Sequence, residues 1–154
     1  MAPTLTEIER LRSLNLRQLL TRSTRAVNER IVGALRVRGF PDARVSHAAV
    51  LANVELRGST VTQIADRALL PKQAISKMVL ELEEFGYLGR SRHDSDGRSV
   101  VLRFTRKGRR LMTATFEVIA GIEDAAQTRL GSRRNAALRS SLLLLLEDDS
   151  GPSD

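Results

Sequence analysis

A change of hydrophobic period at Gly86 restricts the folds open to this chain more than any other feature of its sequence. Before this glycine, apolar residues recur at helical spacing from Pro71 onward, which predicts an amphipathic helix. Its apolar stripe consists of Ile75, Met78, Val79, Leu82 and Phe85. After Gly86, the segments 87–92 and 99–104 have extended patterns and flank Asp96-Gly97, a dipeptide typical of a tight turn. The sequence therefore predicts a helix followed directly by a β-hairpin.

Three helices are expected before this pair. The first is one long helix over residues 5–38. The second covers 46–54, with Ser46 as its N-cap. The third covers 62–68, with Thr62 as the cap. The short third helix and the helix after it are close enough in sequence to form a helix-turn-helix.

Two helices are expected after the hairpin. The first follows Thr105 as its N-cap and runs for about twenty residues. The second follows Gly131-Ser132 and contains the leucine run 142–146. The acidic segment 148–154 is expected to be a disordered tail.

These elements predict a fold that is mainly α with a small β-hairpin wing. A chain of 154 residues, 42% hydrophobic and only 3% aromatic, fits one domain, 1–154, with a core of Leu, Ile, Val and Ala. Within it we expect a winged helix-turn-helix lobe over 46–105. Residues 5–38 together with 106–147 are expected to form a helical dimerisation lobe.

The composition and motif content of the sequence exclude several classes of function. The chain has no cysteine, which excludes a disulfide scaffold, a thiolate zinc site and a thiol redox sensor. No apolar stretch reaches the ~18 residues of a membrane span, so we expect a soluble, cytoplasmic protein. His47 and His93 lie in different elements without metal-ligand spacing, and no phosphate-binding loop occurs. We therefore expect no enzyme activity, no cofactor and no metal.

The charge is strongly positive and unevenly distributed. The formal net charge is +7. Residues 86–110 alone contain eight Arg or Lys and two Asp, whereas residues 111–154 carry more acidic than basic side chains. A concentration of this kind favours a polyanionic partner, although a solvated basic surface would give the same count.

Four polar side chains occupy the first turns of the helix that begins near Pro71, mostly off its apolar stripe. They are Lys72, Gln73, Ser76 and Lys77. The major groove of DNA admits one α-helix, and these residue types can bond to base edges or phosphates there. The alternative is an ordinary solvated helix face.

The predicted wing also carries charge. Arg90, Arg92 and Arg98 flank or occupy its turn, and the narrow minor groove attracts inserted arginine. Asp96 is placed to brace this loop by pairing with a neighbouring cation. The simpler alternatives are a turn-forming Asp-Gly and a basic rim.

The same stretches, in the same order, resemble one known family. They are Gln63-Ile64-Ala65, Lys72-Gln73-Ala74-Ile75-Ser76-Lys77, Leu82, Gly86-Tyr87-Leu88, and Asp94-Ser95-Asp96-Gly97-Arg98 leading through Leu102 and Phe104 to Thr105-Arg106-Lys107-Gly108. They are similar to the MarR (multiple-antibiotic-resistance regulator) family of dimeric winged-helix regulators. The most specific match is the D-x-R wing followed by T-x-x-G. Motif-level similarity covers about residues 58–110.

The resemblance implies a sequence-specific double-stranded DNA-binding regulator, more often a repressor, that acts as a homodimer on a palindromic operator. It implies that the helix after Pro71 enters the major groove, that Arg98 enters the minor groove and that Asp96 orients the wing. It also implies that terminal helices pair two subunits. The residues expected at that interface are Leu16, Leu142, Leu145 and Leu146. An intramolecular core is the competing explanation for these leucines.

Family members often bind small ligands, so release by an effector is expected, with its identity and binding residues unassigned. Two residues depart from the family pattern: Leu69 stands where a turn glycine is common, and Pro71 stands where a capping Ser or Thr is common. The rival function is a protein-interaction module on a winged-helix scaffold. RNA binding is disfavoured because few aromatics are available for base stacking.

Overall fold

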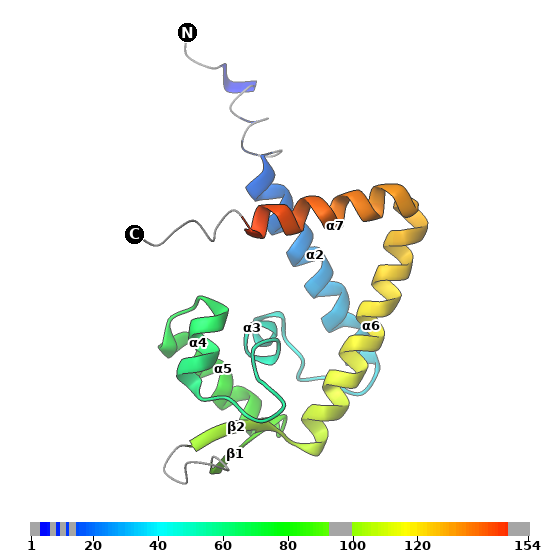
Figure 1. Cartoon of the computed structure of the whole chain (residues 1–154). Coiled ribbons are helices and arrows are strands. Elements are labelled where there is room, and N and C mark those ends of the chain that lie inside the picture. The colour runs from blue at the N-terminus through cyan, green and yellow to red at the C-terminus, as the bar shows by residue number, and fades with distance from the viewer. Residues whose placement is uncertain (1–3, 7–8, 10–11, 13–14, 93–99, 148–154) are drawn as a thin grey trace. The chain divides into compact units, whose positions relative to one another are not determined.

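The computed structural model describes residues 4–6, 9, 12, 15–92 and 100–147, with the backbone alone at Arg92. The elements are α2 (Leu16–Val37), η1 (Val45–His47), α3 (Ala48–Leu51), α4 (Val61–Ala68), α5 (Lys72–Glu84), β1 (Leu88–Arg92), β2 (Val100–Phe104), α6 (Arg106–Leu130) and α7 (Ser132–Glu147) (Figure 1). This mainly helical fold with one antiparallel hairpin confirms the predicted class. None of the helices in the described part combines the length and the apolar character needed to cross a bilayer.

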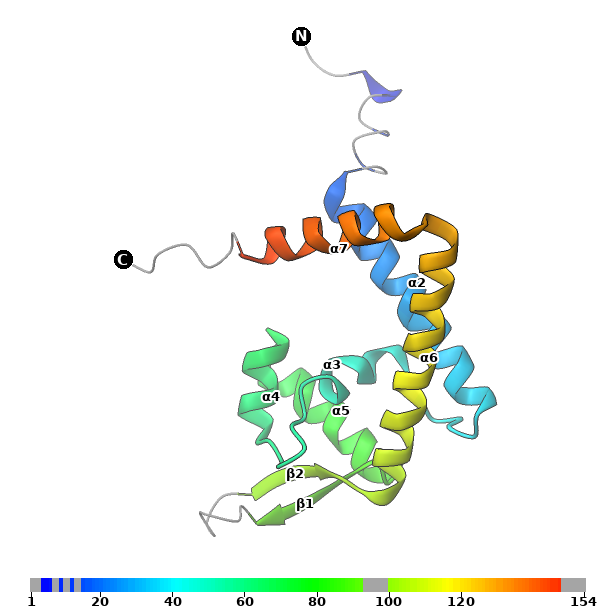
Figure 2. The same cartoon turned by 45° about the vertical axis from the view of Figure 1, so that its right-hand side comes forward.

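The chain divides into two compact units, Met1–Phe116 and Glu117–Asp154. The first unit has a closed core, and its largest fully buried side chains come from helices and strands alike. They include Val50, Ile64, Ile75, Leu82, Tyr87, Val101 and Leu111. Figure 2 shows the hairpin beside α5, which contacts β1. The core therefore fixes the position of α5 relative to the first strand of the hairpin.

The hairpin has the register expected of two strands joined by the segment 93–99. Leu88 pairs with Phe104, and Arg92 pairs with Val100 at the other end. Outside this ladder, Ser59 forms an isolated antiparallel bridge with Leu102. The turn itself lies outside the described residues.

The expectation of one continuous helix over 5–38 is wrong, because the helix is interrupted at Asn15. Asn15 has an extended backbone (ψ 154°), and its side-chain oxygen accepts a hydrogen bond from the Gln18 amide at 2.9 Å. A short polar side chain that caps an amide in this way begins a new helix. The helix α2 therefore begins at Leu16.

The two predicted caps before α5 are also corrected. Ser46 lies inside η1 and caps nothing; the extended residue is Arg44, and the following α3 ends at Leu51. Thr62 lies inside α4, whose cap is Thr60. The Thr60 hydroxyl accepts from the Gln63 amide at 3.2 Å, and the Gln63 side chain accepts from the Thr60 amide at 2.9 Å. This reciprocal pair needs Glu or Gln three residues after the cap, which Thr60 has and Thr62 lacks.

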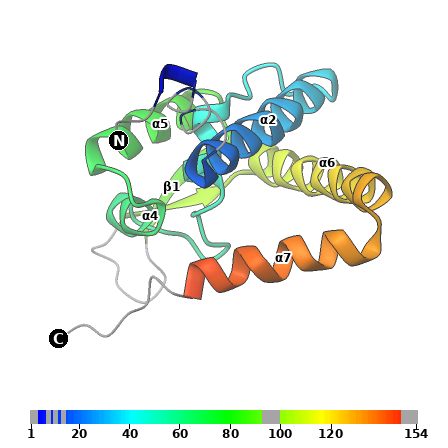
Figure 3. The same cartoon turned by 90° about the horizontal axis from the view of Figure 1, so that it is seen from above.

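The predicted boundaries after α5 are confirmed. Gly86 and Gly131 have positive φ values of 73° and 74° at the ends of α5 and α6. Thr105 precedes α6, and its hydroxyl accepts a hydrogen bond from the Gly108 amide at 3.0 Å. Figure 3 shows α7 turning away from the end of α6 at Gly131.

Candidate nucleic-acid interface

The turn between α4 and α5 contains one residue, Leu69, whose backbone conformation is unfavourable for its type. Leu69 adopts a left-handed conformation (φ 52°) and is 90% exposed. The Leu70 amide donates to the Ala65 carbonyl at 3.1 Å, which closes the end of α4. Pro71 precedes α5 and provides no side-chain cap, so the missing cap bond expected from the sequence is confirmed. The order α4, turn, α5 and hairpin is that of a winged helix.

The first two turns of α5 present polar side chains outward. Lys72, Gln73 and Lys77 are exposed, and Ser76 is half-buried. On the opposite side of the same helix, Ile75, Val79 and Leu82 are almost fully buried. The structure therefore brings together the four residues predicted to enter the major groove; their contact with DNA stays a prediction.

The far end of α5 carries carboxylates that are engaged within the chain. Glu81 accepts from Arg44 at 2.7 Å and lies 3.2 Å from His47 Nε2. The hydrogen bond from His47, followed by the charge of Arg44, holds the pKa of Glu81 below its ordinary value. Glu83 accepts two hydrogen bonds from Arg90, at 2.8 and 3.0 Å. These acidic groups attach α5 to η1 and β1.

The structure describes the predicted wing residues only in part. The Arg90 guanidinium, assigned to the wing from the sequence, forms this bidentate pair with Glu83. Arg92 ends β1. Asp96 and Arg98, like His93, lie outside the described residues, and their roles stay predictions.

His47 ends η1 just before α3. Its side chain is buried, and its ring lies 6.0 Å from the Phe85 ring. No hydrogen-bond partner of Nδ1 occurs in the described part of the chain. The pairing with Glu81 depends on how η1 packs on α5, so the sequence offered no signal for it.

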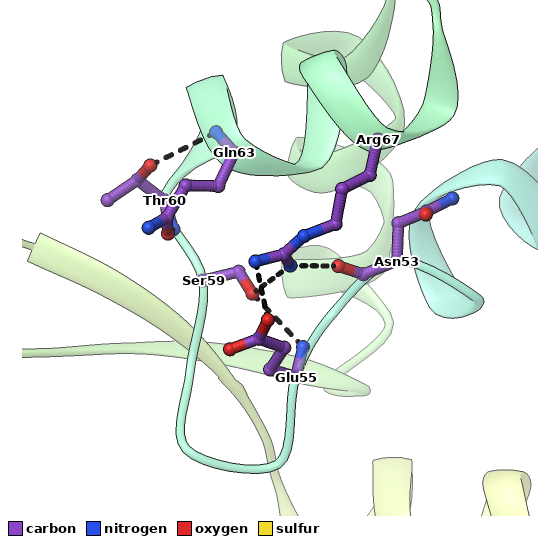
Figure 4. Close-up of polar contacts among 6 residues, drawn as sticks. All are labelled: Asn53, Glu55, Ser59, Thr60, Gln63 and Arg67. Carbon is purple, nitrogen blue, oxygen red and sulfur yellow. Dashed lines mark hydrogen bonds and ion pairs between the residues drawn. The ribbon is translucent and has the colours of Figure 1, made fainter. Parts of the chain in front are cut away.

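A second cluster missed by the sequence analysis surrounds Arg67 of α4 (Figure 4). Its guanidinium donates to the Asn53 carbonyl at 3.0 Å and to the Ser59 hydroxyl at 3.1 Å, and forms an ion pair with Glu55. Ser59 is completely buried. An isolated arginine in a short helix has no distinctive sequence pattern.

The leucines predicted at a dimer interface differ in exposure. Leu16 is 55% exposed, Leu145 46% and Leu146 71%, whereas Leu142 is partly buried. Arg17 and Arg22 are exposed on α2. Pairing of two subunits through these leucines stays a prediction. Among the described residues, no group of three or more His, Asp or Glu side chains is placed to hold a metal ion.

Comparison with known proteins agrees with the winged-helix geometry. Residues 39–99 match the model of the MarR family. No curated protein matches the chain. A solved MarR family transcription regulator superposes with a TM-score of 0.71 at 20% identity, covering 94% of this chain and 91% of that one.

Two further similar structures are of CouR. The transcriptional repressor CouR bound to a 23-mer DNA duplex has a TM-score of 0.66 at 25% identity, covering 95% of this chain and 99% of that one. CouR from Rhodococcus jostii RHA1 bound to p-coumaroyl-CoA has a TM-score of 0.66 at 26% identity, covering 92% and 96%.

The expected resemblance is therefore confirmed. Residues 39–99 match the MarR family model, and the fold of the chain is similar to that of solved MarR family transcription regulators.

Proposed function

We propose that this protein is a DNA-binding transcriptional regulator that inserts α5 into the major groove of duplex DNA. The observation that carries the proposal is the division of α5 into two faces. Lys72, Gln73 and Lys77 are exposed over its first turns, while the opposite face is buried. Gln can pair with adenine and Lys with guanine or phosphate, so this surface can both hold and distinguish duplex DNA.

The charge distribution along α5 supports the same orientation. Its first turn contains no acidic residue. The carboxylates of Glu81 and Glu83, further along, are neutralised by cations of the same chain. A phosphate backbone approaching the start of α5 therefore meets lysines and little uncompensated negative charge.

We also propose that the protein acts in the cytoplasm as a homodimeric repressor on a palindromic site. The exposed leucines of α7 provide apolar surface for a second subunit. CouR, at 25% identity, is a repressor seen on a DNA duplex. Two copies of α5 would then contact successive major grooves about 34–36 Å apart.

The test is binding to duplexes selected by the purified protein from a random-sequence pool, followed by mobility shift. We expect a palindromic site, weaker binding at higher salt and a loss of about tenfold for Lys77→Ala. Arg133→Ala is the control, because it removes one exposed positive charge from α7 and should change affinity less than twofold. Failure to enrich any duplex, or equal losses for both variants, would reject the proposal in favour of a protein-interaction module.

We also propose that a small organic effector releases the protein from DNA. One finding supports this, the structure of CouR bound to p-coumaroyl-CoA. The probe is p-coumaroyl-CoA itself, added to the complex with the selected duplex, with coenzyme A alone as the control. Dissociation by the acyl thioester and not by coenzyme A is the expected result. No dissociation by either would reject this effector class.

A further inference from the structure

The loop between α3 and α4 is fastened to the wing strand β2 at consecutive positions. Ser59 exchanges two backbone hydrogen bonds with Leu102, at 3.0 and 2.9 Å. Next to it, Gly58 has a positive φ of 101°, and a Cβ there would lie 2.9 Å from a methyl group of Val101. The Arg103 side chain donates to the Arg57 carbonyl at 3.1 Å. Movement of residues 57–59 would therefore move β2.

The other side of this loop is held by a single side chain of α4. Arg67 binds the Asn53 carbonyl, the Glu55 carboxylate and the Ser59 hydroxyl at once (Figure 4). The Ser59 hydroxyl also accepts from the Glu55 amide at 3.0 Å, so it joins both ends of the loop. The planar guanidinium presents several donors in fixed directions, which a lysine ammonium on a flexible stem cannot reproduce.

We propose that Arg67 is a positioning residue that holds the wing in place relative to the helix-turn-helix without touching DNA. The connection runs from α4 through the Arg67 guanidinium to Ser59, and from the Ser59 backbone to Leu102 of β2. This inference rests on the proposed function, because it assumes that the wing and α5 contact the same duplex. The ion pair with Glu55 compensates the charge of Arg67, which suits a link within the protein better than a phosphate contact.

The first test needs no DNA. In Arg67→Ala and Arg67→Lys, the amides of Ser59 and Leu102 should exchange with solvent about tenfold faster than in the wild-type protein. The Tyr87 amide, which donates to the Leu82 carbonyl at 2.8 Å, is the internal control and should keep its rate. Unchanged exchange at Ser59 and Leu102, or a uniform rise at all three amides, would overturn the proposal.

The second test uses a duplex selected by the wild-type protein. Arg67→Ala should weaken binding about tenfold, Ser59→Ala should produce a smaller loss, and the double variant should bind no more weakly than Arg67→Ala. Arg139→Ala removes an exposed Arg–Glu pair in the other unit and should keep wild-type affinity. If Arg67→Ala fails to fold, Arg67→Lys and Ser59→Ala replace it.

A direct phosphate contact predicts a different pattern. Ser59→Ala would then bind normally, and Arg67→Ala would lower the slope of log affinity against log salt by about one. That pattern overturns the positioning role, and so does normal affinity of the Arg67 variants accompanied by a lower melting temperature. If the wild-type protein selects no duplex, the proposed function fails, and the exchange experiment alone decides whether Arg67 anchors β2.

Discussion

The two units of the chain bury their apolar side chains to very different extents. In Met1–Phe116, Ile64, Ile75 and Leu82 are completely buried. In α7 of the second unit, no described residue is buried, and Leu143, Leu144 and Leu146 are each more than half exposed. The core of the first unit is thus closed within one chain, whereas α7 contributes no buried residue and has an exposed run of leucines. Substitutions in the buried core of the first unit should therefore act mainly on stability, and substitutions in the exposed leucine run of α7 mainly on assembly.

The largest effect is expected at Gly108 in the first unit. A Cβ at this position would meet the Tyr87 carbonyl oxygen, a backbone atom that cannot move aside. Gly108→Ala should lower the free energy of unfolding by about 3 kcal/mol, measured by urea denaturation. Gly121→Ala in the same helix is the control: apart from the adjacent residues and backbone of its own helix, a methyl group there would meet no atom of the described chain within 4 Å, and it should raise stability by about 0.5–1 kcal/mol. Similar results for the two would show that the contact with Tyr87 is not rigid.

The next effect should appear in assembly. Leu145→Glu combined with Leu146→Glu places two charges in the exposed leucine run of α7 and should raise the dimer dissociation constant about a hundredfold, measured by analytical ultracentrifugation. Leu56→Glu alters a leucine of the first unit that is 89% exposed and should leave the dimer intact. A dimer that tolerates the α7 substitutions would remove the difference between the units.

The next effect is smaller and is a gain in stability, expected at Leu69 in the turn of the helix-turn-helix. Leu69→Gly relieves the left-handed backbone of a leucine, which costs about 1–2 kcal/mol, but adds the unfolded-state entropy of glycine. The net result should be about 0.5 kcal/mol of added stability in urea denaturation. Leu56→Gly, where φ is not positive, should instead be destabilising. A loss of stability at both positions would show that the Leu69 side chain contributes packing that outweighs its strain.

The smallest effect concerns pH. The pKa of Glu81 is held below its ordinary 4.5, first by the His47 hydrogen bond and then by the charge of Arg44, with Lys77 also nearby. A carboxylate with a depressed folded pKa stabilises the protein above its unfolded pKa, and this contribution is lost as the pH falls through the folded value. Urea midpoints of wild type and Glu81→Gln should differ at pH 7 and converge as the pH falls below the lowered pKa of the folded state. Parallel curves would contradict the role of this pair.

The sequence predicted those features that depend on local spacing. The period change at Gly86 placed α5 and the hairpin, and Thr105 placed the start of α6. Caps were less predictable: Thr60 and Thr62 are both plausible alone, and the Gln63 side chain decides between them. The link of Arg67 to Ser59 was not predictable, because it forms only once the loop has packed on β2. Local signals thus locate elements, while tertiary contacts decide which side chains act together.

Several basic side chains of the segment 86–110 already have partners within the chain, which reduces the number that can neutralise DNA phosphates. Arg90, Arg103, Lys107 and Arg109 each donate to a carboxylate or carbonyl of the same chain. If all eight cations of the segment displaced counterions from a duplex, each subunit would contribute about −7 to the slope of log affinity against log salt. The contribution of each subunit should be distinctly smaller than this, so counting the basic residues of the segment overstates how many ions each subunit releases.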